Sequence, residues 1–215
     1  MTWQIVYICI FAALTVTLIA MKLLNMSPRK RGVVKTVTSA AFVAAAVVGC
    51  VQKGGGLHIL LAVGLLFAAA GDVLLIFMDD RRCFIAGVLA FSAASLTLSV
   101  YSVLQYGWTW WSAVVFVLSV AANAICQKAK VYSFGRYVWY LNVYTVLVSA
   151  CGALGLTLLG SGGAALLFGL GCFMYYASDV CLGLYLFKFR SKWVDSVNSL
   201  LYFPGMLLVA LSLLV

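Results

Sequence analysis

Long apolar stretches alternate with short polar clusters along the whole chain. Each stretch is about 20 residues long, which is the length that an α-helix needs to cross the hydrocarbon core of a bilayer. The polar clusters between the stretches are only a few residues long. The pattern predicts eight membrane-spanning helices, at residues 3–24, 33–51, 57–78, 83–105, 108–126, 137–159, 163–187 and 197–215.

Eight spans of this length use most of the chain, so only short loops remain between them. We therefore expect a single polytopic, all-α membrane domain over residues 1–215. The composition agrees, because 66% of the residues are hydrophobic and only 9% are charged, which is too little polar surface for a soluble domain. We do not expect the first span to be a cleaved signal peptide, because its basic residues follow it instead of preceding it.

Basic residues are concentrated in every second loop. All but Lys53 of the 14 Lys and Arg residues fall on the side of the membrane opposite the amino terminus. The positive-inside rule makes that side cytoplasmic and places both termini outside the cytoplasm. The net charge of +9 thus reports topology and an attraction to anionic lipid, and we expect no binding to nucleic acid. The membrane would be a bacterial inner membrane or a eukaryotic endomembrane.

Two short motifs that lie about half a chain length apart resemble each other. Ala70–Leu75 reads AGDVLL in the third span, and Ala177–Leu182 reads ASDVCL in the seventh. Four spans separate them, so both motif helices cross the membrane in the same direction. The similarity between the motifs favours two parallel four-helix halves, about 1–107 and 108–215, as in some transporters.

Each motif places an aspartate inside the membrane. Asp72 lies seven residues from Asp79, and Asp179 lies nine residues from Lys188, so both acids are expected about 10–14 Å inside the cytoplasmic boundary. A carboxylate at this depth is costly and generally faces a bundle interior or a watery cavity. A purely structural acid would be the simpler explanation for one such residue, whereas two at one depth favour a functional site.

Tyrosines accompany the two acids. In the sixth span Tyr144 reaches the same depth and shares a helical face with Tyr140. In the seventh span Tyr175 and Tyr176 precede Asp179 by about one turn and flank its face. These side chains are candidates for contacts with a substrate.

Paired acids in an apolar environment suit general acid and general base catalysis, because one can hold a proton while the other is ionised. The chain has no GxSxG, HExxH or P-loop motif, and the single histidine, His58, is expected on the opposite side of the membrane. The seven cysteines form no CxxC pair, so we expect no metal and no cofactor. A hydrolase acting on a lipid fits best, with Lys35 and Arg82 as candidate phosphate contacts.

The sequence resembles the YhhN family of membrane lysoplasmalogenases. The resemblance covers most of the chain from the third span to the last. It is carried by LLFAAAGDVLL (65–75), FIAGVLAF (84–91), YLNVY (140–144), GGAALLF (162–168), YYASDVCLGLYLF (175–187) and LYFPGMLLVALS (201–212). Lys35 stands where the family has a lysine, although Thr36 replaces the proline that usually follows. Two further positions depart from the family pattern, namely Ser95 for a histidine and Met206 for a glutamine.

The resemblance implies an eight-helix enzyme that hydrolyses the vinyl ether bond of a lysoplasmalogen, a single-chain lysophospholipid, to a fatty aldehyde and a glycerophospho-headgroup. It implies Asp72 and Asp179 as the catalytic acid pair. It also implies Lys35 and Tyr144 as supporting residues. With the residues that lie near the acids in the sequence added, the candidate contacts to the substrate are Lys35, Tyr140, Tyr144, Tyr175, Tyr176, Ser178 and Arg82.

Two other functions fit the same residues. Parallel halves with acids inside the membrane suit a small lipid transporter or a proton-coupled transporter, although no proline breaks either motif helix. The changes at Ser95 and Met206 suit a protein that binds lipid without turning it over. The sequence leaves the oligomeric state and the headgroup open.

Overall fold

The computed structural model describes residues 2–215, and their side chains from Gln4 onward. Over this range all eight expected helices are present, and each is long and apolar enough to cross a membrane. The helices are α1 (Thr2–Leu23), α2 (Pro28–Lys53), α3 (Gly56–Leu74), α4 (Arg81–Tyr106), α5 (Trp110–Lys128), α6 (Val138–Thr157), α7 (Gly163–Leu184) and α8 (Lys192–Leu211). Short helical turns extend α3, precede α6 and extend α7, at Leu75–Phe77, Gly135–Tyr137 and Tyr185–Phe189.

Two helices begin about one turn earlier than the apolar pattern predicts. Helix α2 begins at Pro28, whose fixed φ suits the first helical position, and its first turn contains the basic residues that follow. Helix α8 begins at Lys192, and the Ser191 side chain accepts a hydrogen bond from the backbone N–H of Trp193. The prediction was based on runs of apolar residues, so it missed the polar first turns of these two helices.

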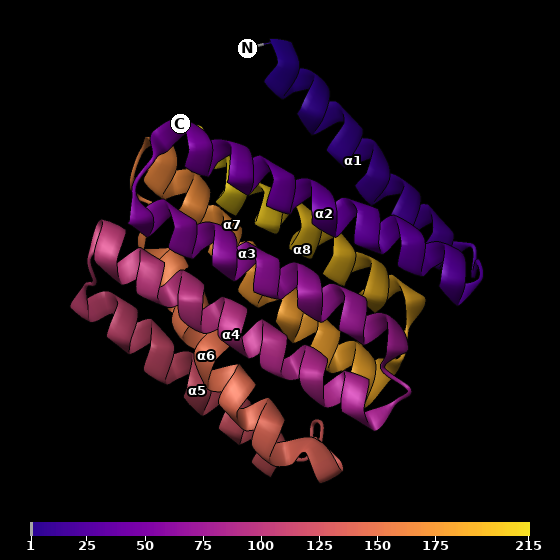
Figure 1. Ribbon diagram of the computed structural model, residues 1–215. Helices are drawn as coiled ribbons and strands as arrows, with labels where there is room; N and C mark the ends of the chain where they lie inside the picture. Colours follow the sequence, from indigo (N-terminus) through magenta and orange to yellow (C-terminus); the bar gives the residue numbers. More distant parts are fainter. Residues whose placement is uncertain (1) are drawn as a thin grey trace.

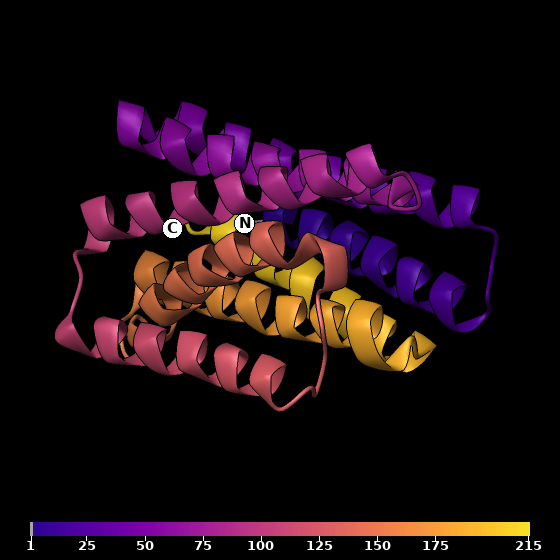
Figure 2. The same ribbon diagram turned by 90° about the horizontal axis from the view of Figure 1, so that it is seen from below.

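The helices form one bundle of alternating up and down segments (Figure 1). The most extensive packing joins α7 to α8 and α3 to α4, and these pairs form the centre of the bundle. Helix α1 packs on α2 and α8 at one edge, while α5 packs mainly on α6 at the opposite edge (Figures 1 and 2). The loops after α1, α3, α5 and α7 lie at one end, which we call the basic end.

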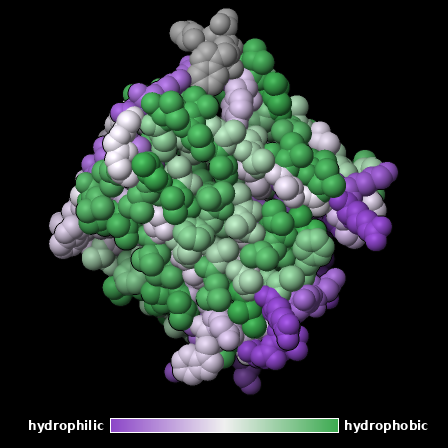
Figure 3. Space-filling model, in the orientation of Figure 1, coloured by the Kyte–Doolittle hydropathy of each residue, from purple (hydrophilic) through white to green (hydrophobic). Residues whose placement is uncertain are grey.

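The outer surface suits a lipid environment. Large apolar side chains such as Val16, Leu104 and Ile125 are exposed on the outside of the helices. Apolar residues cover the middle of the face shown in Figure 3, and hydrophilic residues gather at its right and lower edges, where the basic loops lie. The protein is therefore a multi-pass membrane protein.

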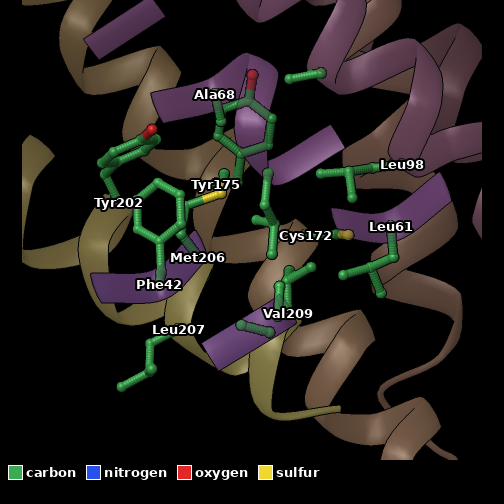
Figure 4. Packing of buried hydrophobic residues seen from close by; sticks show 14 of the residues in the cluster. Phe42, Leu61, Ala68, Leu98, Cys172, Tyr175, Tyr202, Met206, Leu207 and Val209 are labelled. Atoms are coloured by element: carbon green, nitrogen blue, oxygen red, sulfur yellow. The ribbon is translucent and has the colours of Figure 1, made fainter. Parts of the chain in front are cut away.

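The central helices approach each other closely at small residues. A Cβ atom added to Gly171 in α7 would lie 2.6 Å from the carbonyl oxygen of Gly205 in α8. Around this contact, side chains from α2, α3, α4, α7 and α8 fill the core, among them Phe42, Leu61, Leu98, Tyr175 and Met206 (Figure 4). Small residues at the interface permit the close packing on which membrane helices depend.

Candidate functional site: two aspartates in the wall of one cavity

Asp72 in α3 is 2% exposed and has polar contacts from two other helices. Ser39 Oγ in α2 donates to Asp72 Oδ2 at 2.6 Å, and Tyr202 OH in α8 donates to the same oxygen at 2.7 Å. Lys35 Nζ lies 3.1 Å from Asp72 Oδ1. A buried carboxylate needs both a cation and hydrogen-bond donors, and these contacts provide them. Asp72 thus has a cation and two hydrogen-bond donors around its buried carboxyl group.

Local structure explains how these donors come together. Lys35 and Ser39 are four residues apart on α2, so they lie on one helical face. The ring of Tyr202 packs edge-on against Phe42 and Phe91, which holds its hydroxyl group toward Asp72.

Asp179 in α7 has a different environment. Its Oδ2 atom is buried and has no hydrogen-bond partner among the described residues. The hydroxyl group of Tyr144 is likewise buried without a partner there, and it lines a cavity together with Asp179. A buried carboxyl oxygen without a donor favours the neutral, protonated form of its group. The fold therefore gives the two aspartates different surroundings. Asp72 has a cation and two donors, and the Oδ2 atom of Asp179 has no donor.

A polar cavity of about 180 Å³ opens between the basic ends of α1, α2, α3, α7 and α8. Its wall contains both aspartates of the sequence motifs. Its charged lining residues are Lys22, Arg31, Lys35, Asp72, Asp179 and Asp195. Three of these are cations and three are acids, so the cavity places positive charge beside the two motif aspartates.

An apolar cavity of about 340 Å³ lies between α4, α5, α6 and α7. Most of its wall is aliphatic or aromatic, including Val88, Leu141 and Val148. The loop between α5 and α6 closes its basic end with Tyr132 and Phe134, and burial there raises the pKa of the Tyr132 hydroxyl group above its ordinary value. This cavity has the chemical character of a site for an alkyl chain.

The two cavities share part of their walls. Five residues line both of them, namely Leu75, Phe91, Asp179, Leu182 and Leu186. Asp179 is the polar member of this set. Its carboxyl group thus lies where a polar and an apolar ligand group would meet.

Most of the predicted site residues fall in or next to these cavities. Lys35, Asp72 and Asp179 line the polar cavity, and Tyr144 and Tyr176 line the apolar one. The structure therefore brings Asp72 and Asp179, which are far apart in the sequence, into the wall of one cavity.

Four predicted contacts lie elsewhere. Tyr175 is fully buried and its hydroxyl group is 3.0 Å from Ser95 Oγ, while Ser178 donates to the Tyr175 carbonyl oxygen at 2.6 Å. Tyr140 is 39% exposed, and Arg82 is exposed in the first turn of α4. None of these four lines either cavity.

The structure adds residues that the sequence analysis missed. Ser39 and Tyr202 bind Asp72, and Arg31 lines the polar cavity. A signal was present for two of them, because Arg31 and Ser39 lie four residues before and after Lys35 on the same helical face. Ser95 and Met206, where the chain departs from the family pattern, are fully buried and line neither cavity.

Comparison with known proteins gives one match. The model of the YhhN family matches residues 30–213, which is most of the chain and includes both aspartates and the residues around them. Comparisons with curated proteins and with solved structures found no match. The extent of the family match is decisive, and the chain belongs to the YhhN family.

Proposed function

We propose that the protein is a membrane-embedded hydrolase that cleaves the vinyl ether bond of a lysoplasmalogen. The observation that carries the proposal is the position of Asp179, which lines both the polar and the apolar cavity and has a buried oxygen without a donor. An acid in this position faces the junction between the headgroup and the chain of a single-chain lipid.

The two cavities suit the two parts of such a substrate. The alkenyl chain would lie in the apolar cavity, and the glycerophospho-headgroup would lie in the polar cavity among Lys22, Arg31 and Lys35. The vinyl ether joins these parts, so it would lie next to Asp179. The charge of the basic end favours a cytoplasmic orientation, and the substrate would then enter from the cytoplasmic leaflet.

Vinyl ether hydrolysis begins with protonation of carbon. In our proposal the Asp179 carboxyl group gives its proton to the carbon β to the ether oxygen. The electrons of the double bond form the new C–H bond, and positive charge develops on the carbon bonded to oxygen as an oxocarbenium ion. The resulting Asp179 carboxylate stabilises this cation, because it lies in a site of low dielectric constant.

Water addition completes the reaction, with Asp72 as general base. Water loses a proton to the Asp72 carboxylate while its oxygen bonds to the cationic carbon, which gives a hemiacetal. The hemiacetal hydroxyl returns a proton to Asp179, and the C–O bond to glycerol breaks as the leaving oxygen takes the proton held by Asp72. The products are an aldehyde and an alcohol, and both acids regain their initial states.

The donors around Asp72 support this role. Lys35, Ser39 and Tyr202 hold the carboxylate in place and leave it free to accept a proton from water. The buried hydroxyl group of Tyr144 supplies a further polar atom in the cavity that Asp179 shares.

The mechanism is tested by turnover in heavy water. Protonation at carbon predicts an aldehyde that carries one solvent deuterium on the carbon next to the carbonyl group, when the product is trapped by reduction as it forms. Product without that deuterium would rule out carbon protonation and with it the role given to Asp179.

A further inference from the structure

Arg31 differs from the other cations of the polar cavity. Lys22 Nζ is 2.5 Å from Asp195 Oδ1 and 2.6 Å from Ser199 Oγ, and Lys35 pairs with Asp72. Arg31 has no ion pair in the described part of the chain, and its Nε atom is buried without a hydrogen-bond partner. A buried guanidinium N–H without an acceptor is unfavourable, so an anionic ligand in the cavity would stabilise Arg31.

The charged residues that line the polar cavity also identify Arg31 as the cation without a partner. Its wall has three cations, and two carboxylates already pair with two of them. With Asp179 protonated, one positive charge remains, and it belongs to Arg31. The first turn of α2 also directs free backbone N–H groups and the positive end of the helix dipole to this region.

The geometry points to Arg31 as the residue that binds the phosphodiester of the lipid headgroup. The inference rests on the proposed function for the identity of the lipid. A single net positive charge matches the single negative charge of a phosphodiester, and guanidinium binds phosphate oxygens through two parallel hydrogen bonds. The preferred ligand class is thus a single-chain lipid with a phosphodiester headgroup, in place of a phosphomonoester or a neutral glycerol.

Spacing along α2 supports the assignment. Arg31 precedes Lys35 by four residues, which is one helical turn, so it lies about 6 Å nearer the basic end on the same face. Lys35 contacts Asp72, so it indicates how far along the bundle axis the two aspartates lie from the basic end. In a glycerophospholipid with its chain on the first carbon, five single bonds separate the ether oxygen from phosphorus, or about 6 Å when extended. A lipid with its ether oxygen at the acids therefore reaches Arg31 with its phosphate.

Equilibrium binding tests this assignment without requiring turnover. The probes are a saturated single-chain ether phosphocholine lipid, which has no vinyl ether to cleave, and the same ether lipid without phosphocholine. Arg31→Gln is expected to weaken binding of the phosphocholine probe by about tenfold or more, since it removes a charge-assisted contact. Binding of the uncharged probe is expected to stay unchanged, and Arg31→Lys is expected to restore part of the phosphocholine affinity.

Arg29→Gln is the matched control, because Arg29 is an exposed arginine in the same turn and does not line the cavity. It is expected to bind both probes as the wild type does. Equal loss of both probes in Arg31→Gln, or no loss of either, would overturn the assignment. Displacement of the phosphocholine probe by inorganic phosphate alone would overturn the choice of a lipid headgroup. A wild type that binds the probe but releases no aldehyde would contradict the proposed hydrolysis and leave this assignment standing.

Discussion

Lys35 and Asp72 form an ion pair inside the bundle, with Nζ 3.1 Å from Oδ1. The two residues are unequally buried, since the lysine side chain is 25% exposed and the aspartate side chain is 2% exposed. Lys35 thus reaches from the wall of the polar cavity to a carboxylate that has almost no access to water. Removing the lysine leaves that charge uncompensated.

The first prediction concerns this pair. Lys35→Met should destabilise the fold by about 3 kcal/mol or more, because it leaves a buried charge without its partner. Lys30→Met, at an exposed position of the same helix, should have little effect. Thermal unfolding in detergent measures both, and adding Asp72→Asn to Lys35→Met should recover stability but not aldehyde release. Equal melting temperatures for Lys35→Met and Lys30→Met would contradict the structural role given to the pair.

Tyr202→Phe removes the hydroxyl group of Tyr202 and keeps its ring, so it tests the contribution of the hydroxyl group alone. The ring packs against Phe42, Phe91 and Tyr175 and should continue to do so, so the loss of stability should be only about 1 kcal/mol. Aldehyde release should fall by about tenfold or more, because Asp72 loses a donor that positions it. Full activity in a variant with a normal melting temperature would show that this hydrogen bond does not serve the reaction.

The close approach of α7 and α8 gives a prediction about the fold alone. In Gly171→Ala the new Cβ would meet the backbone oxygen of Gly205 at 2.6 Å, which a side-chain movement cannot relieve. We expect the helices to separate and the melting temperature to fall clearly. Gly183→Ala in the same helix is the control, since no heavy atom lies within 4 Å of its added Cβ. An unchanged melting temperature in Gly171→Ala would mean that these helices pack differently.

The apolar cavity predicts selectivity for chain length. Val148 is buried in its wall near the middle of α6, so Val148→Phe should shorten the space for the alkenyl chain. Activity should fall more for long-chain than for short-chain substrates. Val146→Phe, at a 40% exposed position of the same helix, should leave the ratio of the two activities unchanged. The same ratio in both variants would place the chain outside this cavity.

The number of helices followed from the sequence because it depends on the lengths of the apolar stretches along the chain. Asp72 and Asp179 come from helices four spans apart, and the structure places both in the wall of one cavity. Their depth in the membrane stays a prediction. The ends of α2 and α8 were less well predicted, because basic and polar first turns resemble loops.

The sequence did not predict which side of each helix faces the interior of the bundle. Apolar residues surround each helix and leave no clear amphipathic pattern. This explains why Tyr140 was included in the site although it is exposed, and why Tyr202 was missed although it donates to Asp72. Arg31 was assigned only to topology, because its position in the cavity depends on how α1, α2 and α8 come together. The two-halves arrangement and the orientation in the membrane stay predictions.

The most direct test of the account is aldehyde release from a vinyl-ether lysophospholipid by the purified protein, with three variants beside it. The wild type and Asp79→Asn, which changes an exposed acid outside both cavities, should release aldehyde. Asp72→Asn and Asp179→Asn should fold and bind the saturated ether lipid, yet release aldehyde at least about a hundredfold more slowly. Aldehyde release by either of these two variants at the wild-type rate, or none from a folded wild type, would contradict the central claim.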